Sequence, residues 1–196
     1  MKPESNNTSE PTRLASATLS LSIGDNVTIE HDELPTLINN KSTDLYSHGA
    51  ISKVSEITDI SGIVTSRFHL TKDSYIEASF DEDDFAHNRK SLALWVRLEV
   101  SPDINQLPQE DQIRQITSRK LSLLGREFER SDVYVLHEVT NCESEESAYF
   151  QESRFTSLYE SDDGIVLKSV VNESENSGSI EYWQEIPLEA GRILVF

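Results

Sequence analysis

The sequence predicts an α+β protein in which antiparallel β-sheet predominates and one main helix lies near 108–124. Two observations predict this class. Short runs of alternating apolar and polar residues recur along most of the chain, and a single stretch carries apolar residues at helical spacing. The strands are consistent with two small sheets or with a meander-based barrel or sandwich. We expect residues 1–16 to form a disordered tail, because they are polar and contain few apolar side chains.

The remaining residues, 17–196, are expected to form a single domain, with 17–105 and 131–196 as two candidate β subdomains joined by the helix. The first strands are predicted at 17–23 and 27–31, and the Gly-Asp-Asn sequence between them predicts a hairpin turn. Four consecutive strands then predict an antiparallel meander, over 50–57, 63–70, 74–80 and 91–100.

The apolar residues of the meander identify its expected core. In the first hairpin these residues are Phe68, Leu70, Ile76 and Phe80. In the last strand the expected inward set is Leu92, Leu94, Val96 and Leu98, with burial of the opposite face, which carries Trp95, as the open alternative.

The helix prediction depends on signals at both of its ends. Pro108 suits a first helical position, and acidic residues follow it in the first turn. Ile113, Ile116, Leu123 and Leu124 form an apolar stripe, and Gly125 is the expected stop. Strands resume after the helix, over 131–139, 149–160, 164–171 and 179–186, and a docked apolar end follows at 192–196.

The charge balance limits the possible functions. The chain has 35 acidic residues against 17 Lys and Arg, a formal net charge of −18, so it would repel nucleic-acid phosphates and anionic lipids. A single cysteine, Cys142, excludes an intrachain disulfide, and neither a secretory signal nor a membrane-spanning apolar run is expected. We therefore expect a cytoplasmic protein that does not insert into membranes.

No motif in the sequence predicts catalysis. The five histidines are not at metal-ligand spacings, the G-x-S-x-G motif is absent, and there is no Gly-rich phosphate loop. His69 and His137 lie in predicted strands, where they could meet in space. We therefore expect no catalytic residue, no cofactor and no metal ligand.

Charge clusters supply the candidate partner-binding residues. Asp81, Glu82, Asp83 and Asp84 form an acidic run after the first hairpin, which we expect to be a solvated loop that steers a basic partner. Residues 109–130 have a net charge of +1, whereas residues 143–196 have a net charge of −9. The basic candidates for contact with an acidic partner are Arg119, Lys120 and Arg126.

The segment "VSEITDISGIVTSRFHLTKDSYIEASF" resembles the central hairpin of the YjfK-like proteins of bacteria. The matching residues are Ile57, Asp59, Arg67, Phe68, Leu70, Asp73, Tyr75 and Ile76, and "EIPLEAGRILVF" resembles the closing segment of that family. The family has no established enzymatic activity, so the resemblance implies no catalytic residues. Its members are typically encoded beside PspA-like membrane-remodelling proteins, which implies an accessory role there.

We therefore expect a non-enzymatic cytoplasmic accessory or binding protein, linked to a PspA-like envelope-stress or membrane-remodelling system and bound to a basic or PspA-like protein. One alternative is an acidic inhibitor, such as an immunity protein or a nucleic-acid mimic, that binds a basic target. The other is an enzyme with a dispersed carboxylate or histidine site. This last alternative predicts a deep pocket with ionisable groups of perturbed pKa beside His69 or His137.

Overall fold

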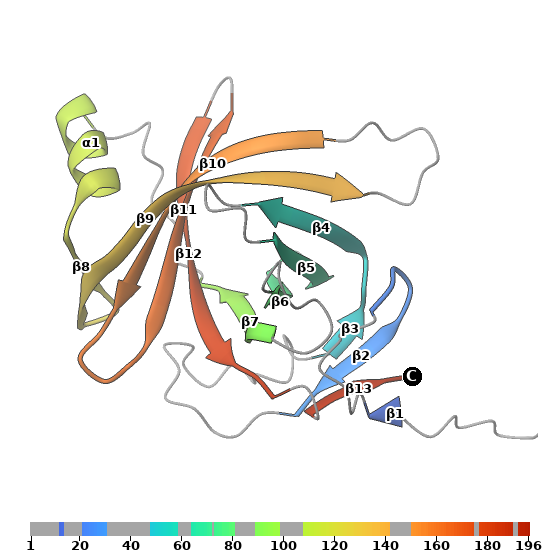
Figure 1. The fold of residues 1–196 in the computed structure, drawn as a ribbon. Helices are drawn as coiled ribbons and strands as arrows, with labels where there is room; N and C mark the ends of the chain where they lie inside the picture. The colour runs from blue at the N-terminus through green and yellow to red at the C-terminus, as the bar shows by residue number, and fades with distance from the viewer. Residues whose placement is uncertain are drawn as a thin grey trace, which may run out of the picture.

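A computed structural model shows mostly antiparallel β-strands in two sheets, with very little helix (Figure 1). The predicted predominance of antiparallel sheet is therefore confirmed. The structure describes residues 12–13, 21–30, 48–58, 64–71, 73–80, 89–98, 108–141, 150–174, 177–189 and 192–196.

The predicted meander forms the centre of the larger sheet. Its strands are neighbours in chain order and all pair antiparallel: β4 (Lys53–Thr58), β5 (Val64–Thr71), β6 (Ser74–Phe80) and β7 (Arg89–Arg97). The Thr71–Ser74 turn is fixed by side chains, because the Thr71 hydroxyl lies 2.9 Å from the Ser74 hydroxyl and accepts a hydrogen bond from the Asp73 backbone N–H at 3.1 Å. The four strands predicted for this part of the chain are confirmed, although β7 begins at Arg89 and ends at Arg97 rather than covering 91–100.

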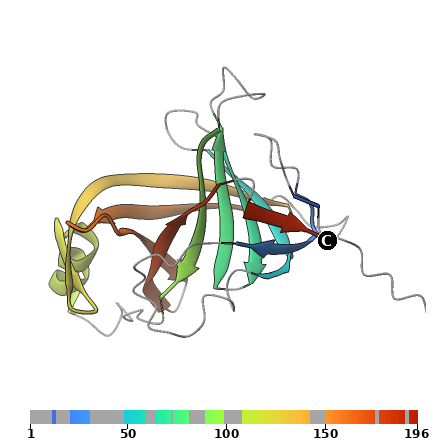
Figure 2. The same cartoon turned by 90° about the horizontal axis from the view of Figure 1, so that it is seen from below.

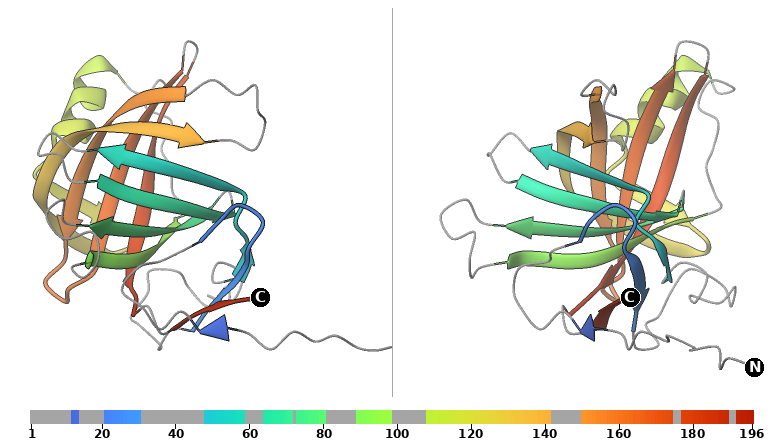
Figure 3. Two further views of the ribbon diagram at one scale, coloured as in Figure 1. Left: turned by 45° about the vertical axis from the view of Figure 1, so that its right-hand side comes forward. Right: turned by 90° about the vertical axis from the view of Figure 1, so that its right-hand side faces the viewer.

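A second meander completes the larger sheet with β9 (Arg126–Asn141), β10 (Phe150–Glu160), β11 (Val166–Ser174) and β12 (Ser177–Pro187). β12 pairs with β7, while β9 pairs with β10 along one edge and with β4 along the other. All strands of this sheet except β8 (Lys120–Leu123) therefore close into a ring, which Figure 3 shows from two sides. A closed sheet has two distinct faces, one turned into the ring and one turned out of it.

The smaller sheet covers part of the outward face. It contains β1 (Thr12–Arg13), β13 (Ile193–Val195), β2 (Asn26–Ile29) and β3 (His48–Ala50), in that order. Figure 2 shows β2 and β13 at the opposite end of the molecule from the helix. Apolar side chains of this sheet pack on the outward residues of β5, β6, β7 and β12, and together they form the largest core cluster: Leu21, Val27, Ile29, Ile51, Phe68, Leu70, Ile76, Ala78, Leu92, Leu94, Val96, Ile186, Leu188 and Ile193.

The predicted helix over 108–124 is wrong in its second half. Only α1 (Gln109–Thr117) is helical; the chain becomes extended at Ser118 and then forms β8. β8 pairs with the start of β9 through a tight turn in which Leu124 and Gly125 both have positive φ, 52° and 78°. Gly125 therefore serves a β-hairpin rather than a helix end, and pairing with β9 outweighs the helical spacing of the leucines.

Other expectations differ locally. Residues 21–23 precede a turn at Gly24 and are not in a strand, so the hairpin expected between 17–23 and 27–31 does not form as predicted; β2 instead pairs with β13 and β3. The run predicted over 50–57 is divided between β3 and β4. Thr12 and Arg13, inside the expected disordered tail, form β1. Among the described residues, no helix is long and apolar enough to cross a membrane.

Candidate binding site on the inner face of the closed sheet

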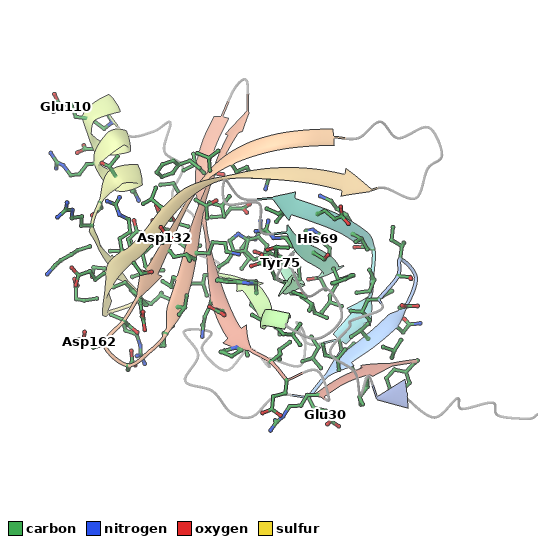
Figure 4. All side chains as sticks on the ribbon, in the orientation of Figure 1. Glu30, His69, Tyr75, Glu110, Asp132 and Asp162 are labelled. Carbon is green, nitrogen blue, oxygen red and sulfur yellow. The ribbon has the colours of Figure 1, made fainter. Side chains whose placement is uncertain are left out.

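The face of the closed sheet that points into the ring carries ionic and aromatic side chains. We call it the inner face. Its described members come from alternate positions of paired strands, and Figure 4 shows Tyr75 and His69 inside the ring while Glu110 and Asp162 lie at the periphery. They include Ser55, Arg67, His69, Tyr75, Glu77, Ala93, Trp95, Leu158, Lys168, Val170, Trp183 and Glu185.

An ion network crosses this face. Glu77 on β6 accepts a hydrogen bond from Arg67 Nε at 2.7 Å, and its two carboxylate oxygens accept hydrogen bonds from Lys168 Nζ at 2.9 and 3.0 Å. Lys168 comes from β11, which β12 and β7 separate from β6 in the sheet. Three strand spacings amount to about 14 Å along the sheet, so the contact must cross the interior of the ring.

Burial and charge act together on these groups. Burial by itself would raise the pKa of Glu77, but the charges of Lys168 and Arg67 outweigh it and lower that pKa to about 2. Burial lowers the pKa of Lys168 to about 8, against the opposing attraction of Glu77. The Lys168 side chain is 1% exposed, so its ammonium group depends on partners inside the protein.

Aromatic rings surround the network. Lys168 Nζ lies 3.7 Å from the centre of the Trp95 ring, and the guanidinium carbon of Arg67 lies 4.8 Å from the centre of the Tyr75 ring. The Tyr75 and Trp183 rings are 4.9 Å apart. Both cations therefore rest against π faces, which attract positive charge. Trp95 and Trp183 are also the only two tryptophans of the chain.

A second, more open ionic chain continues from the aromatic group. Trp183 Nε1 donates to Glu181 at 3.2 Å, and the other oxygen of Glu181 pairs with Arg97 Nη1 at 3.1 Å. Arg97 also forms an ion pair with Asp73 in the β5–β6 turn. Because the Arg97 side chain is 33% exposed, this chain marks the rim where the inner face meets solvent.

The predicted partner-binding residues lie elsewhere. Asp81, Glu82, Asp83 and Asp84 lie outside the described residues. Arg119 and Lys120 are exposed at the start of the β8–β9 hairpin, and Arg126 forms an ion pair with Asp163 in the β10–β11 turn. The structure brings the three basic residues onto one hairpin but does not bring them to the inner face.

His69, singled out as a strand histidine, does lie on the inner face. Its Nε2 is 3.3 Å from the Ser55 hydroxyl, and its ring is 5.4 Å from that of Tyr75. The backbone of His137 belongs to β9, but its side chain is not among those described. Within the described part of the chain, no group of three His, Cys, Asp or Glu residues could hold a metal ion.

The ion network of Arg67, Glu77 and Lys168 was not predicted from the sequence, although one signal was present. Lys168 lies within an apolar run, between Leu167 and the valines that follow. A lysine on a strand with one solvent-exposed face would not need apolar neighbours on both sides. Glu77 alternates with Ile76 and Ala78 and looks like any solvated strand position. Only the closure of the sheet into a ring shows that the Glu77 side chain points into the interior rather than into solvent.

Comparison with protein-family models, with curated proteins and with solved structures finds no match to this chain. The resemblance to the YjfK-like family therefore stays a prediction.

Proposed function

We propose that this chain is a non-enzymatic binding protein whose binding site is the inner face of the closed sheet. The observation that carries the proposal is the placement of Arg67, Glu77 and Lys168 inside the ring, while apolar residues of the same strands point outward. Buried ionic groups are costly unless paired and are found disproportionately at functional sites. Closed sheets of eight strands, as here, have an interior that is filled by side chains or holds one small ligand.

Two features favour binding over catalysis. With a pKa of about 2, Glu77 stays ionised at neutral pH and is a poor general base, because an efficient base has a pKa near the working pH. The Lys168 amine is held by Glu77 and rests on the Trp95 ring, and with a pKa of about 8 it is mostly protonated at neutral pH, which makes it a poor nucleophile.

A ligand screen tests the proposal. Purified protein would be heated with small amides, carboxylic acids, amines and alcohols, and its intrinsic fluorescence recorded, since both tryptophans lie on the inner face. A ligand at a hundred times its Kd stabilises the folded state by about 2.7 kcal/mol, which raises Tm by about 5–10 °C for a chain of this size. Lys168→Met should reduce the shift, whereas Leu124→Asn in the β8–β9 turn should not. Equal shifts in both variants, or no shift with any compound, would contradict the proposal.

A second proposal concerns macromolecular partners. We propose that the acidic exterior binds a basic protein, in a cytoplasmic accessory role of the PspA-linked kind that the family resemblance implies. The net charge of −18 supports a basic partner, and the single cysteine supports a reducing compartment. Pull-down from a bacterial lysate at low and high salt tests it: a stoichiometric partner lost at high salt is expected. Whether that partner is PspA-like or a basic enzyme would separate the accessory role from that of an acidic inhibitor.

A further inference from the structure

The indole N–H of Trp95 is a buried donor that lacks an acceptor among the described residues. Trp95 is 4% exposed, and its Nε1 makes no hydrogen bond there. The second indole is different, because Trp183 Nε1 donates to Glu181. A buried donor without an acceptor destabilises the folded state, because it has given up its hydrogen bond to water. Trp95 therefore marks a position where an acceptor is needed on the inner face.

Glu185 is the matching acceptor-rich neighbour. It lies directly opposite Trp95 in the β12–β7 pairing, and side chains at such positions start about 5 Å apart. It is partly buried, and no described residue donates a hydrogen bond to it. Burial raises the pKa of Glu185, Lys168 opposes the rise, and Glu77 and Glu160 add to it. One donor without an acceptor and one carboxylate without a donor thus stand side by side.

The surrounding charges select a neutral ligand group. An anion could accept from Trp95 and would be attracted by Lys168, but it would meet the negative charge of Glu185 directly opposite and would leave that carboxylate without a donor. A cation could pair with Glu185 but would meet Lys168 and would leave Trp95 without an acceptor. A carboxamide meets both needs, because its carbonyl oxygen accepts and its N–H donates from adjacent atoms.

We propose that Trp95 and Glu185 bind a small ligand through a carboxamide group, with the ligand carbonyl accepting from Trp95 Nε1 and the ligand N–H donating to the Glu185 carboxylate. This inference rests on the proposed binding function and names the ligand class for the same inner face. The proposed site therefore includes Trp95 and Glu185 in addition to the ion network of Glu77.

The test is titration of ¹⁵N-labelled full-length protein with propionamide, propionate, propylamine and 1-propanol, followed by the two indole N–H signals in NMR spectra. Trp95→Phe assigns the signals. Propionamide should shift the Trp95 signal saturably and the hydrogen-bonded Trp183 signal less, and the other three compounds should shift the Trp95 signal weakly. Glu185→Ala should weaken propionamide binding about tenfold or more, since hydrogen bonds to charged groups are worth about 1.5–3 kcal/mol. The matched control is Glu189→Ala, whose side chain is 84% exposed near the end of the same segment and should leave binding unchanged.

The other outcomes each overturn the inference. A larger shift with propionate, propylamine or 1-propanol would assign the site to an anion, a cation or a hydroxyl group. If none of the four compounds moves the Trp95 signal and a bound water shows cross-relaxation with its N–H, the acceptor is water. If the screen yields a Lys168-dependent ligand that leaves the Trp95 signal in place, this inference fails while the proposed function stands. If no compound of any class binds, both fail.

Discussion

The two faces of the closed sheet use the same strands in opposite ways. On β6, Ile76 points outward and is fully buried under the smaller sheet, while its neighbours Tyr75 and Glu77 point into the ring. On β7, Leu94 points outward and Trp95 inward. Apolar burial, the dominant stabilising term, is thus concentrated on the outside of the ring together with the smaller sheet. The inside holds a smaller apolar and aromatic cluster, of Tyr75, Ala93, Trp95, Val170 and Trp183, around ionic groups that contribute little net stability.

The pKa values show why the inner network is nearly neutral for folding. Lowering the pKa of Glu77 from 4.5 to about 2 stabilises the fold at pH 7 by about 3 kcal/mol. Lowering the pKa of Lys168 from 10.5 to about 8 destabilises it by a similar amount, about 3 kcal/mol. The two shifts act in opposite directions; both contain the same Glu77–Lys168 attraction, so they do not simply add, and a buried ion pair of this kind typically contributes little net stability. An outer-face substitution should therefore change stability alone, and an inner-face substitution should change binding as well.

The largest effect is expected from Glu77→Gln. This change removes the carboxylate that Arg67 and Lys168 share and leaves two neighbouring buried cations. Removing one member of a buried charge network typically costs about 3–5 kcal/mol, and we expect about 4 kcal/mol from urea unfolding. The double variant with Lys168→Met, which removes one of the two cations, should be less destabilised than the sum of the single changes. Additive losses would contradict the network.

Next comes Ile76→Ala, the adjacent residue on the opposite face. Truncating a fully buried isoleucine costs about 2–5 kcal/mol, and we expect about 3 kcal/mol. Because Ile76 packs on the outer core, the folded variant should retain the ligand affinity of the parent protein. Loss of affinity comparable to that of Lys168→Met would show that the two faces are not independent.

The pH dependence of Glu77 gives the third effect. Its folded pKa lies below its unfolded value, so its stabilising contribution is present above about pH 5 and is lost as the pH falls towards 2. The stability difference between the parent protein and Glu77→Gln should therefore shrink by up to about 3 kcal/mol over that range. Chemical unfolding of both proteins at matched pH values measures it, and a constant difference would contradict the low pKa.

Lys168→Met should have a smaller effect, a loss of about 1 kcal/mol in the free energy of unfolding at pH 7. Glu77 keeps its hydrogen bond from Arg67, and the cost of burying an ammonium disappears, while the contact with the Trp95 ring is lost. The parent protein should gain stability between pH 8 and pH 10.5, because its Lys168 pKa is lowered on folding, and the variant should lack that gain. A loss above about 3 kcal/mol at pH 7 would make Lys168 a structural residue.

The outer and inner faces of the closed sheet also differ in how well the sequence predicts them. Period-two alternation located the β4–β7 meander and the burial of Phe68, Leu70 and Ile76, because alternation depends only on strand geometry. It could not tell which face meets solvent. Here the smaller sheet covers the outer face and ring closure encloses the inner one, so Glu77 looks like a surface position, and burial of Trp95 stays undecided, until β9 is paired with β4. Such pairing is a property of the whole fold, and no local pattern encodes it.

The smallest predicted effect is at Leu124, in the hairpin that replaced the second half of the expected helix. Leu124 has a φ of 52° and is about half exposed, so the leucine gains little burial and adopts a backbone conformation that asparagine tolerates better. Leu124→Asn should stabilise the protein by about 0.5–1 kcal/mol. The β8–β9 turn contributes no residue to the inner face, so ligand affinity should stay the same while Tm rises. A helix over 108–124 would respond in the opposite way, because asparagine is a poorer helix former than leucine. A lower Tm in this variant would therefore favour the helix over 108–124 that the leucine spacing predicts, and it would contradict the β8–β9 hairpin.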